Sequence, residues 1–190
     1  MLSLGLGLNR SAKPPKALLL DFSVDTPLVD FFNSYSVNGG ALTFTTNQTI
    51  SGVTGNNFLK IVYPGIAQTG VNSDISGVRM AVNPIESSAV QPGFYWRCTF
   101  DAYLEDDSDW TTGDDNDVVS TIVNFGGKAK KININTDELV SVDTGTQQAS
   151  NPTSNFLIYF NSPGDIPGPN ATWYIRNITL KFGKTESSIA

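Results

Sequence analysis

The sequence predicts an all-β domain, a β-sandwich of two antiparallel sheets with an extended N-terminal arm. Its apolar segments are short, rich in β-branched and aromatic residues, and bounded by Gly, Pro, Asn or Asp. The 190 residues include 17 glycines and 10 prolines, which favours many turns over long helices. Several segments alternate apolar and polar residues. Each of these would offer one apolar face to a common interior, and two facing sheets satisfy them all.

The clearest predicted strand is the aromatic segment 94–105. Every second residue in it is apolar, which places one face in the core and leaves the other partly in water. The residues of the apolar face are Phe94, Trp96, Cys98, Phe100, Ala102 and Leu104. We expect strands at 17–24, 41–46, 57–63, 74–82, 94–105, 117–125, 128–134, 139–144, 155–161 and 172–182.

Two places depart from regular strands. Residues 25–36 are expected to form a single helical turn, with Phe31 and Phe32 capping the sandwich. Arg176 shares strand parity with Ile178 and other apolar residues. Either the inward-facing side changes near Asn177, most simply through a bulge, or the guanidinium reaches a buried carboxylate.

The N-terminal octet reads as an extended arm. Its leucines alternate with serine or glycine, so that a strand would carry one apolar edge. The leucines are Leu2, Leu4, Leu6 and Leu8, and Arg10 follows them in a basic, proline-bearing tether. We expect the arm to pack against a neighbouring molecule, with the alternative that it frays or lies on its own sheet. The predicted organisation is an arm and tether at 1–16, a sandwich at 17–183 and a polar C-terminal tail at 184–190.

Charge and cysteine content narrow the classes of partner. The first 16 residues hold three basic and no acidic residues, so the rest of the chain holds nine basic against 18 acidic. That balance argues against nucleic acid as a ligand. The single cysteine, Cys98, excludes an internal disulfide and is expected to be a small buried group. No secretory signal is convincing, and no segment has the roughly 20 apolar residues of a membrane span.

The chain lacks histidine, and this argues against an enzyme. The commonest general base and every Ser-His-Asp or Cys-His arrangement are thereby excluded. A pair of carboxylates can still hydrolyse glycosides, and the segment 101–117 holds eight acidic residues. Catalytic carboxylates need distinct environments, however, and a crowded surface loop does not supply them. We predict a protein without catalytic activity and without an organic cofactor.

The same acidic loop is a candidate calcium site, because closely spaced carboxylates supply hard oxygen ligands. The candidate ligands are Asp107, Asp109, Asp114 and Asp115. The loop lacks the helix-loop-helix calcium pattern, since Thr112 stands where a glycine is required. A solvated hairpin loop without a metal is the alternative.

Three aromatic residues are candidates for ligand binding by stacking. Trp110 lies within the acidic loop, where no core is evident for it to join. Tyr95 and Tyr103 lie on the non-core face of the strand 94–105 and are expected to extend a platform around Trp110. Alternatively, Trp110 folds against the rim of the sandwich or is buried in a neighbouring subunit.

The order of segments resembles the jelly-roll β-sandwich of carbohydrate-binding modules. The resemblance covers about residues 17–182 and is one of strand pattern. The segments that carry it are ALLLDFS at 17–23, GGALTF at 39–44, FLKIV at 58–62, FYWRCTF at 94–100 and WYIRNITL at 173–180. It implies that the chain recognises surface glycans through its aromatic residues.

An apolar arm followed by such a sandwich also resembles small virion proteins of tailed bacteriophages. In that group, jelly-roll domains serve as capsid decorations, head fibres or tail parts. The leading hypothesis is therefore a non-enzymatic structural protein of a virion, made in the host cytoplasm and anchored by its arm to other virion proteins or to copies of itself. The alternative is a carbohydrate-binding module.

Overall fold

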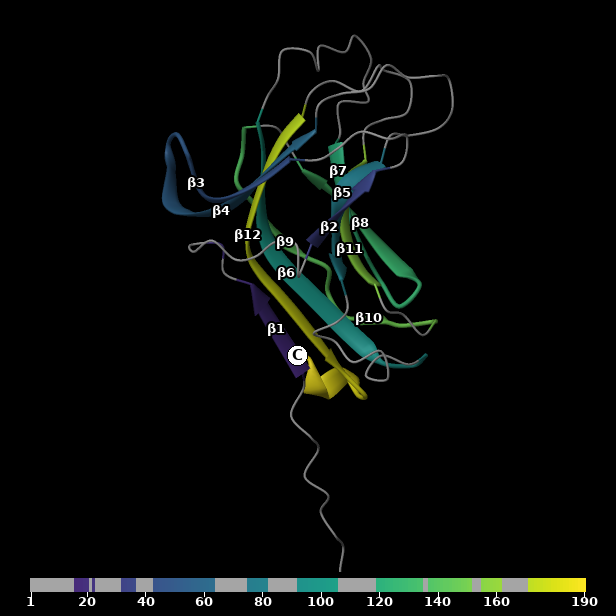
Figure 1. Ribbon diagram of the computed structural model, residues 1–190. Coiled ribbons are helices and arrows are strands. Elements are labelled where there is room, and N and C mark those ends of the chain that lie inside the picture. The colour runs from purple at the N-terminus through teal and green to yellow at the C-terminus, as the bar shows by residue number, and fades with distance from the viewer. Residues whose placement is uncertain are drawn as a thin grey trace, which may run out of the picture.

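A computed structural model of the chain describes residues 16–20, 22, 32–36, 43–63, 75–81, 92–105, 119–134, 137–151, 155–161 and 171–190. In these ranges the chain forms two antiparallel sheets (Figure 1), which confirms the predicted fold class. The predicted arm precedes the first of these ranges, so its conformation and its partners stay predictions.

The larger sheet has seven strands and is built around two long central ones. These are β6 (Tyr95–Glu105) and β12 (Ala171–Gly183), which pair with each other along most of their length. β12 also pairs with β4 and β1, β4 pairs with β3, and β6 also pairs with β9 and β10. The bounds are β1 (Lys16–Leu20), β3 (Thr43–Ile50), β4 (Val53–Tyr63), β9 (Val140–Asp143) and β10 (Gln147–Gln148).

The second sheet has five strands in the order β2-β5-β11-β7-β8. They are β2 (Phe32–Ser36), β5 (Ile75–Ala81), β11 (Asn155–Asn161), β7 (Val119–Phe125) and β8 (Lys128–Ile134). Every strand predicted from the sequence overlaps an observed one. The predicted helical turn is wrong for residues 32–36, because they pair with β5 as an edge strand and take their hydrogen bonds from that partner.

The core lies between the two sheets and is centred on aromatic residues. Phe125 of β7 faces Trp96 of β6 edge to face, with 6.0 Å between ring centroids. The same ring contacts Phe156 of its own sheet and Phe182 of β12, at 5.8 and 6.3 Å. The apolar face predicted for 94–105 is confirmed from Trp96 to Leu104, where each alternate residue is buried, whereas Phe94 precedes β6 and is half-buried.

A β-bulge in β12 changes which residues face the core. The register with β6 shifts between Arg176 and Thr179, and Asn177 has a φ of 54°. Ile175 before the bulge and Ile178 after it are both buried, although they are three residues apart. The predicted bulge near Asn177 is therefore confirmed.

After β12 the chain folds back onto the sandwich. A short 3-10 helix covers Glu186–Ser188, and Ile189 beyond it is buried. Figure 1 shows this C-terminal segment beside the ends of β1 and β12. The segment expected to be a polar tail thus carries a buried apolar side chain, which lies beside Gly183 of β12. No helix in the described ranges has the length and apolar character needed to cross a membrane.

Two glycines with nearly the same backbone conformation give a matched test of how the turn between β7 and β8 packs against Ala149. Gly126 and Gly145 have φ values of 61° and 60°. A Cβ on Gly126 would collide with Ala149, whereas one on Gly145 would meet nothing within 4 Å. Both alanine variants should lose about 1 kcal/mol of unfolding free energy from the left-handed backbone. Gly126→Ala should lose at least about 1 kcal/mol more from the collision. Urea unfolding measures the difference, and equal midpoints would contradict the packing described here.

Candidate functional site

The outer face of the larger sheet carries a line of polar and aromatic side chains along β6 and β12. They point outward because the alternate residues on both strands fill the core. We call this line the outer strip, and its described residues are partly exposed apart from the buried Tyr174. The outer strip comprises Tyr95, Arg97, Thr99, Asp101 and Tyr103 of β6, and Tyr174, Arg176, Thr179 and Lys181 of β12.

Tyr103 marks one end of the outer strip and is held by its neighbours. Its ring meets that of Tyr174 edge to face at 6.0 Å, and its hydroxyl donates a 2.9 Å hydrogen bond to Asp137. Lys60 of β4 lies over the Tyr174 ring, 5.6 Å from the centroid. Burial first, then the hydrogen bond to Asp137 and the nearby negative charges, raise the pKa of Tyr103 to about 12. The ring is therefore neutral and fixed in orientation at physiological pH.

The middle of the outer strip is a hydrogen-bonded cluster around Asp101. Its carboxylate accepts bonds from Arg176 Nε at 3.0 Å, Asn177 Nδ2 at 2.9 Å and Ser141 Oγ at 3.0 Å. The ion pair with Arg176 is only 15% and 19% exposed on its two sides. The sequence left open a bulge or a buried carboxylate as the explanation for Arg176; the structure has the bulge, and the carboxylate that Arg176 reaches is the partly exposed Asp101.

Arg176 also ties the hairpin of β3 and β4 to the outer face. Its guanidinium carbon lies 4.3 Å from the centroid of the Phe58 ring, and Nη1 donates a 2.7 Å hydrogen bond to the Thr54 carbonyl. Phe58 forms a second apolar cluster with Ile50 and Tyr174, separate from the main core. The middle of the outer strip thus packs against this second apolar cluster, and its charged groups Arg176 and Asp101 are paired with each other.

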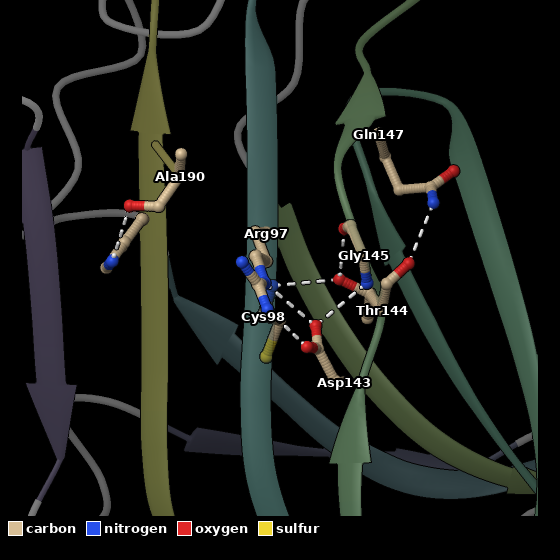
Figure 2. A network of polar contacts seen from close by, with 8 residues as sticks. Arg97, Cys98, Asp143, Thr144, Gly145, Gln147 and Ala190 are labelled. Carbon is tan, nitrogen blue, oxygen red and sulfur yellow. Dashed lines mark hydrogen bonds and ion pairs between the residues drawn. The ribbon is translucent and has the colours of Figure 1, made fainter. Parts of the chain in front are cut away.

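Arg97 and Asp143 form an ion pair near the other end of the outer strip (Figure 2). Arg97 Nε donates to Asp143 Oδ1 at 2.9 Å, and Arg97 Nη2 donates to Oδ2. The backbone N–H of Gly145 donates a further 2.9 Å bond to Oδ1. The hydrogen bond from Arg97 and that from Gly145 lower the pKa of Asp143 and outweigh the opposing effect of burial. The same pair raises the pKa of Arg97.

Behind this pair, Cys98 is fixed in the core and has no reactive character. Its backbone N–H donates a 2.9 Å bond to Thr144 Oγ1, which in turn donates to the carbonyl of Gly145. Gln147 Nε2 donates to the Thr144 carbonyl at 2.8 Å (Figure 2). The Cys98 side chain is fully buried, and this burial raises the pKa of its thiol. The expected role of a small buried group is confirmed.

The structure places Tyr95 and Tyr103 on the same outer face, as the alternation predicted. They lie at opposite ends of β6, eight residues apart, which corresponds to about 26 Å along a strand. They therefore do not form one compact platform. A ligand that contacts both rings must be extended along β6.

Several predicted site residues lie outside the described part of the chain. They are Trp110, the candidate calcium ligands Asp107, Asp109, Asp114 and Asp115, and the arm residues Leu2, Leu4, Leu6, Leu8 and Arg10. Within the described ranges, no group of three or more acidic, cysteine or histidine side chains is arranged to hold a metal ion.

Sequence reasoning missed Arg97, Asp143, Lys181 and Tyr174 as members of one surface. The period of two along 94–105 identifies Arg97 as outward-facing. Nothing in the sequence gives the pairing register that brings Asp143 or Lys181 beside it.

No protein-family model and no curated protein matches this sequence. Among solved structures, an arabinose-bound α-L-arabinofuranosidase, MgGH51, matches with a TM-score of 0.50 and 9% identity, over 90% of this chain and 26% of that one. The C-terminal family 22 carbohydrate-binding module of Clostridium thermocellum Xyn10B matches with a TM-score of 0.49 and 11% identity, over 85% and 90%. A two-module fragment of the same xylanase, containing a family 22 module and complexed with xylohexaose, gives 0.47 and 11%, over 90% and 29%.

The chain thus spans under a third of the arabinofuranosidase and of the two-module xylanase fragment. At these identities the likeness concerns the fold. The described residues form an antiparallel β-sandwich, and the likeness to the arabinofuranosidase extends over 90% of this chain.

The depressed pKa of Asp143 predicts how its contribution to stability varies with pH. The contribution is complete above the pKa of the unfolded carboxyl, about 3.9, and is lost as the pH falls through the lower pKa of the folded state. Asp143→Asn should therefore lower the free energy of unfolding at pH 7, and the deficit should shrink below about pH 4. Urea unfolding of both proteins at pH 7, 5 and 3 measures it. A deficit that stays constant over this range would show that the pair does not act as described.

Proposed function

We propose that this β-sandwich is a non-catalytic carbohydrate-binding domain that holds an extended glycan along its outer strip. The observation that carries the proposal is the outer strip itself, a rigid line of polar groups with a partly exposed tyrosine at each end. The fold supports it as well, because it is similar over 90% of this chain to part of an α-L-arabinofuranosidase whose structure holds bound arabinose.

The chemistry of the outer strip suits a sugar chain. Sugars offer apolar ring faces, which stack on aromatic side chains, and hydroxyls, which exchange hydrogen bonds with polar ones. The strip provides Tyr103 and Tyr95 for stacking and threonine, lysine and arginine groups between them. All stand on the paired central strands, so little conformational entropy is lost when they bind.

The carboxylates of the outer strip do not suit glycoside hydrolysis. A general acid needs a carboxyl group that remains protonated near neutral pH. Asp143, next to the outer strip, has a pKa lowered by Arg97. The Asp101 carboxylate is already occupied by hydrogen bonds from Arg176, Asn177 and Ser141. Together with the lack of histidine in the whole chain, this supports a binding role without catalysis.

Replacing Tyr103 tests the proposal directly. Tyr103→Ala removes the ring and should weaken polysaccharide binding about tenfold, as expected for one lost stacking contact. Tyr103→Phe keeps the ring and loses the hydrogen bond to Asp137, so it should bind nearly as well as the unmodified protein. Affinity electrophoresis in gels containing soluble plant, algal and bacterial polysaccharides measures both, and circular dichroism checks folding. If no polysaccharide retards the unmodified protein, the proposal is wrong.

The structural role in a virion remains a second hypothesis, favoured by the alternating leucines of the arm. An arm of this kind buries apolar surface and satisfies its backbone groups when it adds to a neighbour's sheet. The two roles are compatible, since a virion protein can also bind surface glycans.

Deleting residues 1–15 tests the assembly role, because the deletion stops just before β1. The full chain should elute as an oligomer or join a larger particle, and the truncated chain should elute as a monomer in size-exclusion chromatography with light scattering. A full-length protein that is already monomeric, and that stays so when mixed with other proteins of its source particle, would contradict the hypothesis.

A further inference from the structure

Two cationic side chains face each other across the central strands at one end of the outer strip. In the register of β6 and β12, Lys181 stands directly opposite Arg97. Like charges in directly opposite positions on one face of a sheet are destabilising. Asp143 offsets one of the two charges through its ion pair with Arg97. Lys181 donates a hydrogen bond to the Ala190 oxygen at 3.2 Å, so each cation has an acceptor among the described residues.

Both cations also retain unused hydrogen-bond donors. Arg97 donates hydrogen bonds to Asp143 from Nε and Nη2, and its Nη1 makes no hydrogen bond within the described part of the chain. Figure 2 shows one terminal nitrogen of Arg97 directed away from Asp143. Lys181 Nζ has three donors, and among the described residues one of them bonds the Ala190 oxygen at 3.2 Å. The Arg97 side chain is 36% exposed, so these donors are accessible to a ligand.

A tyrosine ring lies next to the two cations. Tyr95 is two residues before Arg97 on the same face of β6, about 7 Å away along the strand. Its partner on β12 is Gly183, and Ser188 and Ile189 of the C-terminal segment occupy the space where a side chain at that position would lie. On the other side it pairs with Gln148, whose exposed amide is a further polar group.

We propose that Tyr95, Arg97 and Lys181 form a subsite for an acidic sugar residue, a uronic acid, within the glycan-binding face. The ring of Tyr95 stacks on the sugar, and Arg97 Nη1 and Lys181 Nζ donate charge-assisted hydrogen bonds to its carboxylate. The unused donors of Arg97 and Lys181 match the two oxygens of one carboxylate. This inference rests on the proposed function and adds the class of sugar that the face selects.

The net charge of −6 does not oppose such a ligand at short range. At physiological ionic strength, charges separated by more than about 8 Å are largely screened. The groups that decide binding are those that touch the carboxylate. The selectivity therefore depends on Arg97 and Lys181 more than on the overall charge.

The test compares each acidic polysaccharide with a neutral form of the same backbone. Suitable pairs are polygalacturonate, alginate and glucuronoxylan, each against its carboxyl-reduced form. The unmodified protein should bind the acidic member of at least one pair more tightly. Lys181→Gln should weaken binding to that member about tenfold, the loss expected for one charge-assisted hydrogen bond, and leave binding to the neutral member unchanged. Lys181→Arg should restore the preference.

Lys131→Gln is the matched control. It removes the same charge from an exposed lysine on β8, in the other sheet, and should change neither affinity. Equal binding of both members of every pair, with no effect of Lys181→Gln, would overturn the subsite while leaving glycan binding intact. A preference lost in Lys131→Gln but kept in Lys181→Gln would place the anion site on β8 and also overturn it. If no polymer binds at all, the proposed function itself fails.

Discussion

The pairing of β6 with β12 is the interaction on which the rest of the molecule depends. Side chains alternate between the two faces of a strand. This one pairing therefore places one set of side chains in the core and the other set on the outer strip. Trp96 and Phe182 meet Phe125 of the opposite sheet on one side. Arg97 and Lys181 stand together on the other. A change in the register of this pair would disturb stability and the candidate site at once.

The bulge at Asn177 reconciles these two demands within β12. Without it, Arg176 and Ile178 would share a face, and either the arginine would enter the core or the isoleucine would be exposed. The extra residue leaves Ile178 buried and turns Arg176 toward Asp101 and Phe58. The close approach of Arg176 to Gly55 adds a further constraint, since any Cβ at that position would collide with the guanidinium.

Much of the fold is predictable from the sequence because its signals are local. The alternation in 94–105, the turn residues and the parity of Arg176 are all read over a few neighbouring positions, and the structure confirms them. β2 was missed because an edge strand of five mostly polar residues has no clear apolar alternation. The contacts of Arg97 with Asp143 span 46 positions and depend on strand register, which no local pattern specifies.

The distribution of satisfied and unsatisfied groups suggests where the outer strip binds. Its middle is internally paired, because Asp101 and Arg176 already use each other and their neighbours. Its ends differ, since Tyr103 presents an oriented ring and Arg97 retains unused donors. The two ends are about 26 Å apart along β6, so a short sugar can reach only one of them. A longer glycan that is bound at one end holds its next sugar units close to the other end. The second contact then forms within the complex at a high effective concentration. On this arrangement, affinity should rise steeply once the glycan is long enough to span the strip.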